Sequence, residues 1–403
     1  MSTRSPWRER LGRRAVLALA LAVPAPASFA QARLEATVAG AAESFSAEDG
    51  AAQGQSALAG GIAVEYALGS RGRLFYELDA GDFSTPGAWT YAVHRAGGVS
   101  ATDLGGGARL FLGLDATLRA NGEAWSAADF RALGALMNLE LRPAQAMTAW
   151  LGYRIDSRRF PDLPALDQLQ HGGHAGLRLN LPSRTTVIAQ VHVGGKSYEG
   201  EPLTIATPSF GAFAAAAGGG RRGMGPGLRP VAPATTAEER AGQVHVLARL
   251  AQSLADRTGV SVQVWSRQVW GGAPPALVTT PALFFDDGVY DDPFASDAWG
   301  WRAALKHVRP GGAALEASVD GVRKEFTAAL ALGADGLPVA GGPLRSDRIL
   351  RAALAASLPL LRARTGAVEL DLQAGYDFTR QRSNDAFYRY TAHGATLGVA
   401  VRY

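Results

Sequence analysis

The chain has 403 residues, no cysteine, 49 glycines and a formal net charge of +4 at pH 7. The lack of cysteine excludes disulfides, thiol catalysis and thiolate metal sites, so the fold must be stabilised in another way. The first 30 residues contain five arginines and one glutamate, which account for the whole +4. The remainder is electrically balanced, so charge gives no reason to expect nucleic acid as a partner.

The amino-terminal segment has the three parts of a secretory signal peptide. Five arginines between Arg4 and Arg14 precede an apolar run, Ala15–Val23, and Ala27–Ala30 ends in a small-residue cleavage pattern. The apolar run is too short to cross about 30 Å of hydrocarbon as a helix. The sequence therefore predicts a signal peptide at residues 1–30 and a mature chain of residues 31–403 that starts at Gln31.

Beyond residue 30, the hydrophobic pattern has the period of a β-strand. In Met147–Arg158, apolar residues such as Leu151 and Tyr153 alternate with Arg154 and Asp156. Alternating segments of this kind run for about 10–14 residues, whereas strands of soluble proteins are usually about 5–6 residues long. A tilted transmembrane strand needs about 9–11 residues, and it presents one apolar and one polar face. No later apolar run is long enough for a transmembrane helix.

The pattern predicts sixteen antiparallel strands joined alternately by short turns and long loops. A poor pattern around 88–96 leaves fourteen strands as the alternative, and 347–361 also has helical propensity, although its alternation favours a strand. The expected strands are 33–45, 56–68, 72–83, 88–96, 106–118, 130–142, 146–157, 171–182, 184–197, 243–254, 259–270, 298–308, 312–325, 347–361, 366–380 and 390–403.

The last segment, Ala395–Tyr403, alternates and ends in an aromatic residue. It resembles the closing strand of Gram-negative outer-membrane β-barrels of the porin-like type, in which a terminal aromatic is part of the signal read by the barrel assembly machinery. The resemblance covers the architecture of the whole mature chain and points to no subfamily. It implies an all-β, antiparallel transmembrane β-barrel with short periplasmic turns and long extracellular loops, and Tyr403 as the barrel-closing signal.

On this register the charged side chains face the lumen of the barrel. The early strands and 366–380 are mainly acidic and 146–308 mainly basic, so either opposed charged walls line an open pore or the charges pair and fill the lumen. The lumen-facing candidates are Arg109, Asp115, Arg154, Asp156, Arg178, Lys196, Arg249, Arg267, Arg302, Lys306, Glu369 and Asp371.

Two loops have unusual compositions. Residues 198–242 form a long low-complexity loop that is expected to be disordered, and its Arg221, Arg222 and Arg229 are candidates for contacts with lipopolysaccharide phosphates. Five aspartates between Asp286 and Asp297 do not have EF-hand spacing, so we expect a solvated acidic loop and no metal site.

The histidines offer little support for catalysis. His171 and His174 are the most promising pair, but their spacing on a strand puts the two rings on opposite faces. We expect no enzymatic activity and no cofactor.

The sequence thus predicts an outer-membrane channel for passive diffusion of small hydrophilic solutes. Its expected partners are outer-membrane lipid, lipopolysaccharide and the barrel assembly machinery, and a homo-oligomer remains open. The alternatives are a non-conducting barrel that anchors or assembles a surface or export system, and a soluble periplasmic β protein.

Overall fold

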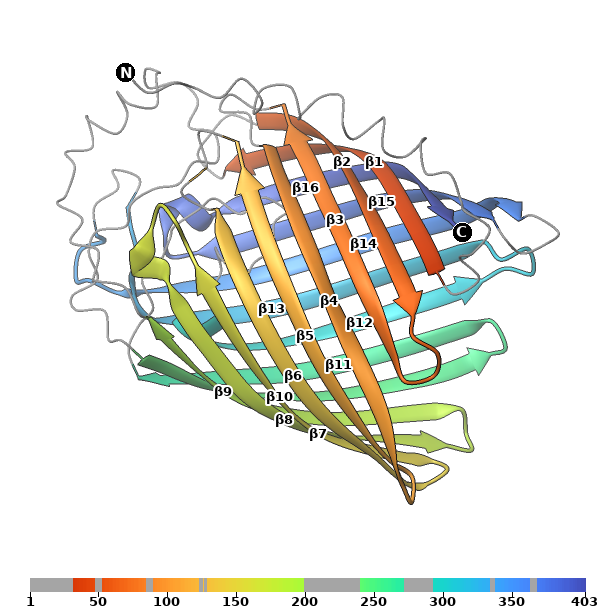
Figure 1. Ribbon diagram of the computed structural model, residues 1–403. Helices are drawn as coiled ribbons and strands as arrows, with labels where there is room; N and C mark the ends of the chain where they lie inside the picture. The colour runs from red at the N-terminus through yellow and green to blue at the C-terminus, as the bar shows by residue number, and fades with distance from the viewer. Residues whose placement is uncertain are drawn as a thin grey trace, which may run out of the picture.

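The computed structural model describes residues 32–47, 53–84, 90–122, 126, 129–198, 240–271, 293–333, 338–362 and 368–403. These residues form one closed antiparallel β-barrel in which each strand pairs with its neighbours in sequence (Figure 1). The strands are β1 (Ala32–Ala47), β2 (Gln53–Ala67), β3 (Gly72–Phe83), β4 (Thr90–Gly105), β5 (Ala108–Asn121), β6 (Phe130–Ala144), β7 (Met147–Arg159), β8 (Gln168–Leu181), β9 (Thr185–Tyr198), β10 (Arg240–Ala255), β11 (Thr258–Gly271), β12 (Ser296–Val308), β13 (Ala314–Leu330), β14 (Leu344–Arg362), β15 (Glu369–Ser383) and β16 (Tyr390–Arg402).

The barrel closes by pairing of the first and last strands. Glu35 of β1 lies opposite Arg402 of β16, and Leu34 and Tyr403 exchange two backbone hydrogen bonds of 2.9 Å. Closure satisfies the backbone groups that an open sheet would leave at its edges, which is a requirement for strands that cross lipid. The predicted count of sixteen strands is confirmed, and the alternative of fourteen is wrong.

Large apolar side chains cover the outer face of the barrel. In β5, Leu112, Leu114 and Leu118 are exposed, whereas Arg109 and Asp115 lie on the other face. The same alternation runs through the other strands, and it puts dozens of leucines, valines and tyrosines on the outside. Such a surface needs lipid as its solvent, so the fold is that of a transmembrane β-barrel. None of the helices in the described residues is long and apolar enough to cross a membrane.

The two ends of the barrel differ. Tight turns such as 106–107, 145–146 and 256–257 join strands at one end, and long connections such as 160–167 join them at the other. We call these the tight-turn end and the long-loop end. Two 3-10 helices, η2 (Pro164–Leu166) and η4 (Ala386–Tyr388), lie in long connections, and η3 (Pro293–Ala295) leads into β12. Of the predicted low-complexity loop 198–242, Tyr198 belongs to β9 and residues 240–242 belong to β10, and 199–239 lie outside the described residues. The aspartate-rich loop up to residue 292 and the predicted signal peptide also lie outside them.

Several strands extend past the predicted bounds, and β4 does so by the most residues. β4 continues to Gly105, although we expected it to end near residue 96. Pairing with β3 and β5 continues through Gly97 and Gly98 at its centre. The Phe75 ring of β3 occupies the space beside Gly97 that a side chain would fill. A Cβ atom at Gly97 would come within 2.6 Å of the Phe75 ring. The segment 347–361 is a strand, as its alternation predicted.

Candidate channel lumen

The inner face of the barrel carries the charged side chains. Because side chains alternate between faces, every residue opposite to the exposed apolar set points inward. This places all twelve candidate residues on the inner face: Arg109, Asp115, Arg154, Asp156, Arg178, Lys196, Arg249, Arg267, Arg302, Lys306, Glu369 and Asp371. A part for them in conduction stays a prediction.

A ladder of ion pairs crosses the inner face from β3 to β7. Arg95 of β4 lies 3.7 Å from Glu77 of β3 and 3.7 Å from Asp115 of β5. Arg154 of β7 contacts the same Asp115 at 3.0 Å and Asp156 of its own strand at 2.6 Å. Asp115 is therefore shared by two guanidinium groups. This side of the lumen is electrostatically paired.

A glycine makes the long reach of Arg154 possible. β6 lies between Arg154 and Asp115, and its residue at that level is Gly134, directly opposite both Asp115 and Asp156. A Cβ atom at Gly134 would lie 2.6 Å from Nη2 of Arg154 and 2.7 Å from Oδ1 of Asp156. The missing side chain leaves room for the guanidinium to lie over β6. Sequence periodicity could not reveal this arrangement.

A second ionic cluster lies at the seam between β1, β16 and β15. Arg402 contacts Glu35 at 3.3 Å, Asp371 at 2.6 Å and Glu369 at 3.8 Å. Glu369 and Asp371, two of the predicted lumen-facing residues, therefore pair with Arg402, which was not among the predicted lumen-facing residues. Arg73 and Arg95 were also missed, and Arg73 pairs with Glu65 at 3.0 Å. Much of the expected acidic wall is therefore paired with arginines of neighbouring strands, whereas the inward Asp79 and Asp377 make no ion pair with a described residue.

The strands β8 to β12 form a different wall. Their inner face carries Arg178, Lys196, Arg249, Arg267, Arg302 and Lys306, and no described residue of these five strands points a carboxylate inward. We call this surface the basic wall. Arg178 and Arg249 both lie opposite Ile188, so they are two strands apart at one level. Arg302 reaches Glu316 of β13 at 3.7 Å, at the border of the wall.

Three cations of the basic wall are exposed and lack an ion pair within the described ranges, although Lys306 lies directly opposite Glu316 of β13 in the strand register. Arg178, Arg249 and Lys306 make no ion pair or side-chain hydrogen bond with any of the described residues. Arg267, by contrast, donates to the carbonyl oxygen and hydroxyl of Ser296 at 3.2 and 3.0 Å. These positive charges lie toward the tight-turn end. Arg178, Arg249 and Lys306 all lie in the second half of their strands, before the short turns that follow β8, β10 and β12.

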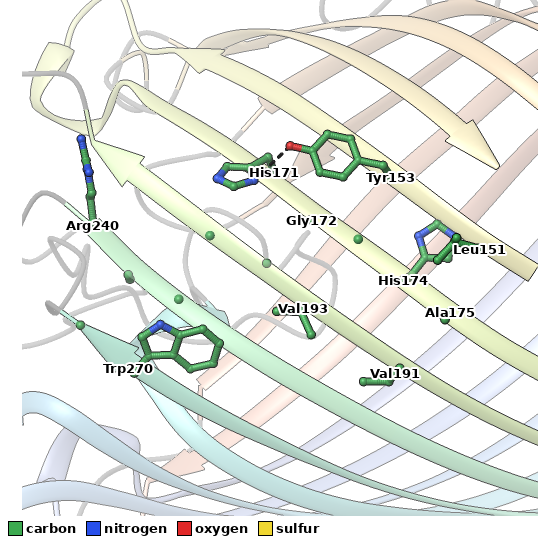
Figure 2. Close-up of a pocket in the computed structure, with 16 residues that line it drawn as sticks. Leu151, Tyr153, His171, Gly172, His174, Ala175, Val191, Val193, Arg240 and Trp270 are labelled. Carbon is green, nitrogen blue, oxygen red and sulfur yellow. Dashed lines mark hydrogen bonds between the residues drawn. The ribbon is translucent and has the colours of Figure 1, made fainter.

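The histidine pair suggested by the sequence is split between the two faces. The hydroxyl of Tyr153 and Nδ1 of His171 are 3.2 Å apart on the outer face (Figure 2). His174 lies on the inner face, in register with His192 and His245 of the next two strands. Among the described residues no three histidine, aspartate or glutamate side chains gather as a metal site.

A groove of about 840 Å³ lies on the outer face beside Tyr153 and His171. Leu151, Val191 and Val193 line it, and Figure 2 shows Trp270 on its far side, on β11. The outward residues Gly173, Gly195 and Gly242 contribute to the lining, and the Trp270 ring lies over Gly242, where a Cβ atom would clash with it. Its apolar lining and outward position make it part of the lipid-facing surface and not of the lumen.

Buried side chains fill the inner face at the long-loop end. The Arg345 guanidinium lies 3.1 Å from the ring centroid of Tyr388 and 4.2 Å from that of Phe326, and it pairs with Asp347. Gln381 donates to Asp347 at 3.0 Å. Burial raises the pKa of Tyr388 to about 12, and the neighbouring Arg345 acts in the opposite direction. We call this set the rim clamp; no part of it was predicted.

Comparisons with known proteins show similarity of fold. No family model and no curated protein matches the chain. Acinetobacter baumannii OccAB4 is similar at 8% identity and a TM-score of 0.47, over 94% of this chain and 100% of that one. Pseudomonas aeruginosa OccK2 (OpdF), solved in complex with glucuronate, is similar at 10% identity and a TM-score of 0.48, over 92% and 96%. A Pseudomonas aeruginosa FadL homologue is similar at 11% identity and a TM-score of 0.39, over 93% and 90%.

The outer membrane protein opdK from Pseudomonas aeruginosa is similar at 10% identity and a TM-score of 0.44, over 92% of this chain and 98% of that one. The predicted barrel architecture is confirmed by the closed antiparallel sheet of this chain itself, and no subfamily is identified. Because identities near 10% concern the fold alone, function has to be argued from the residues of this chain.

Proposed function

We propose that this chain is an outer-membrane channel for passive diffusion of small hydrophilic solutes and that its lumen favours anions. The supporting observation is the set of exposed cations Arg178, Arg249 and Lys306 on the inner face, none of which makes an ion pair with a described residue. Arg178 and Arg249 carry most of the argument, because Lys306 lies directly opposite Glu316 of β13. An ionised side chain without a partner is very costly in a dry interior, so these groups require water beside them. A barrel of sixteen strands is wide enough to hold an aqueous channel.

The preference for anions follows from the asymmetry of the lumen. On the side of β3 to β7 most inward carboxylates are paired with arginines, as in the contact of Asp115 with Arg154, and Asp79 is an exception without an ion pair among the described residues. On the basic wall, no described carboxylate offsets the cations of β8 to β11. Uncompensated Lys and Arg side chains lining a pore raise the local concentration of anions and repel cations.

Planar-bilayer recordings test this proposal. The purified protein should give stable conductance steps, and its reversal potential in a KCl gradient should show a preference for chloride. The triple variant Arg178→Gln, Arg249→Gln, Lys306→Gln should still conduct but lose most of that preference. Arg131→Gln is the matched control, because this exposed arginine lies on the outer face near the long-loop end and should leave selectivity unchanged.

A non-conducting barrel that anchors or assembles a surface or export system is the second candidate. The observation in its favour is the filling of the inner face at the long-loop end, where Phe294 is 1% exposed and the rim clamp is buried. Heat-modifiable gel mobility reports a folded barrel independently of conduction. A folded wild-type protein that gives no steps would contradict the channel and support this alternative.

Export and assembly belong to the same proposal. We expect protein recovered from the outer-membrane fraction to begin at Gln31, and deletion of Tyr403 to lower the yield of folded barrel through poorer engagement of the barrel assembly machinery. Full-length protein that keeps residues 1–30 in that fraction would contradict the predicted signal peptide.

A further inference from the structure

Charged residues on the outer face are concentrated toward the long-loop end. Below them, β13 to β15 present Leu350, Leu354 and Tyr376 to lipid. Above this apolar surface, the outward residues include Arg323 of β13, Arg348 of β14 and Arg382 of β15. The outward residue changes from Leu350 to Arg348 in β14 and from Phe378 to Arg380 in β15, two positions along each strand. Such a change is expected where a hydrocarbon layer meets its headgroups.

Three of these arginines lie side by side across the sheet. Arg348 is directly opposite Arg323 on one side and directly opposite Arg382 on the other. Arg380 lies on the same face, two residues before Arg382 and opposite Leu350. We call these four residues the arginine row. Residues directly opposite in an antiparallel pair have Cβ atoms about 4.5–5.5 Å apart, so these arginines are immediate neighbours on the outer face.

Little in the described structure balances this charge. Arg323 contacts Glu325 at 2.6 Å. Arg348, Arg380 and Arg382 are exposed, and they make no ion pair or side-chain hydrogen bond with the part of the chain that is described. Like charges placed directly opposite each other destabilise a sheet. An anion lying on the row would remove that cost, so the arrangement has the form of an anion site.

The position and the residue type indicate which anion. Guanidinium groups bind phosphate oxygens through paired hydrogen bonds, and several forks side by side suit a ligand with more than one phosphate. The site faces the lipid, at the end of the barrel with long loops, which our proposed orientation puts outside the cell. We propose that the arginine row binds the phosphate groups of lipopolysaccharide in the outer leaflet. The inference rests on the proposed membrane and orientation but not on conduction.

Lipid retention by the folded, full-length protein in detergent tests this site. Bisphosphorylated lipid A is the probe, and the readouts are lipid-bound species in native mass spectrometry and the apparent Kd from a titration. The variant Arg323→Gln, Arg348→Gln, Arg382→Gln should weaken binding by at least about tenfold, because several charge-assisted contacts are lost together. Arg348→Lys keeps the charge without the fork and should give an intermediate affinity.

The lumen supplies a matched control. Arg178→Gln with Arg249→Gln also removes exposed positive charge, but from the inner face, and it should leave the affinity for lipid A unchanged. Heat-modifiable mobility verifies that each variant is folded. Binding that is unchanged in the row variant, equal loss in the lumen variant, or equal affinity for dephosphorylated lipid A would each overturn the proposal. Lipid retention is measured without conductance, so failure of the lipid site and failure of the channel are distinguishable.

Discussion

The guanidinium of Arg154 lies 3.0 Å from the carboxylate of Asp115, although a whole strand separates the two residues in the barrel. The contact passes over Gly134, and it gives Asp115 a second cation in addition to Arg95. Because Asp115 is 9% exposed, it depends on these partners more than a solvated carboxylate would.

Gly134→Ala should separate this pair. The added methyl would lie 2.6 Å from Nη2 of Arg154, so the guanidinium must move and its contacts must weaken. We expect a loss of about 1–3 kcal/mol in the free energy of unfolding, measured by urea titration in lipid vesicles. Gly40→Ala is the control, because a Cβ atom there would meet nothing within 4 Å. Equal effects of the two changes would show that the ladder is not the cause.

Asp115→Asn should alter selectivity. It removes one negative charge that now balances Arg95 and Arg154. The lumen would become more basic, so the reversal potential in a KCl gradient should move further toward that of chloride. A shift in the opposite direction would contradict the assignment of these residues to the conducting path.

Arg345→Ala should destabilise the long-loop end. The change would leave Asp347, which is 1% exposed, without its cation, and it would remove the contacts with the rings of Tyr388 and Phe326. The expected cost is about 3–5 kcal/mol, because a buried carboxylate would be unpaired. Arg309→Ala in an exposed turn is the control and should change stability by less than about 0.5 kcal/mol. Urea titration of both variants provides the measurement.

The rim clamp should also make stability fall in strong alkali. The pKa of Tyr388 is raised from 10.0 to about 12 in the folded protein, so the unfolded chain loses this proton first as the pH rises. The associated stability is present in full below pH 10 and is lost as the pH passes from 10 to 12, with a total on the order of 2 kcal/mol. Tyr388→Phe should flatten this part of the pH profile. If the Tyr388→Phe variant lost as much stability between pH 10 and pH 12 as the wild type, deprotonation of Tyr388 would not be the cause of that loss.

Alternation within each strand made the barrel predictable from the sequence. In β5, the alternation of Leu112 and Leu114 with Arg109 and Asp115 shows which face meets lipid. This can be read from the sequence of the strand alone, without knowing which strands pair with it. The pairing of charges was not predictable in this way. It depends on register between strands and on gaps such as Gly134, and neither is expressed in a period of two. Arg402, whose partners come from β1 and β15, was missed for the same reason.

The rim clamp was missed for a different reason. Arg345 and Asp347 share one face of β14 with other polar residues, so their pattern resembles that of any lumen-facing pair. Only the return of η4 over β14 brings Tyr388 onto the guanidinium and buries both groups. The course of a loop over a barrel mouth depends on tertiary contacts that strand periodicity does not describe.

The seam at Arg402 has a consequence for how the barrel forms. Arg402 and Glu35 are 367 residues apart in sequence, so this bond can form only after all sixteen strands have been synthesised. Contacts of such long range are formed late, because the intervening chain must be ordered first. A shift of β16 by two residues would keep its apolar side toward lipid but would carry Arg402 away from Glu35. The ion pair therefore favours the native register of β16 against β1 when the barrel closes. A barrel whose β16 is shifted by two residues would lack it.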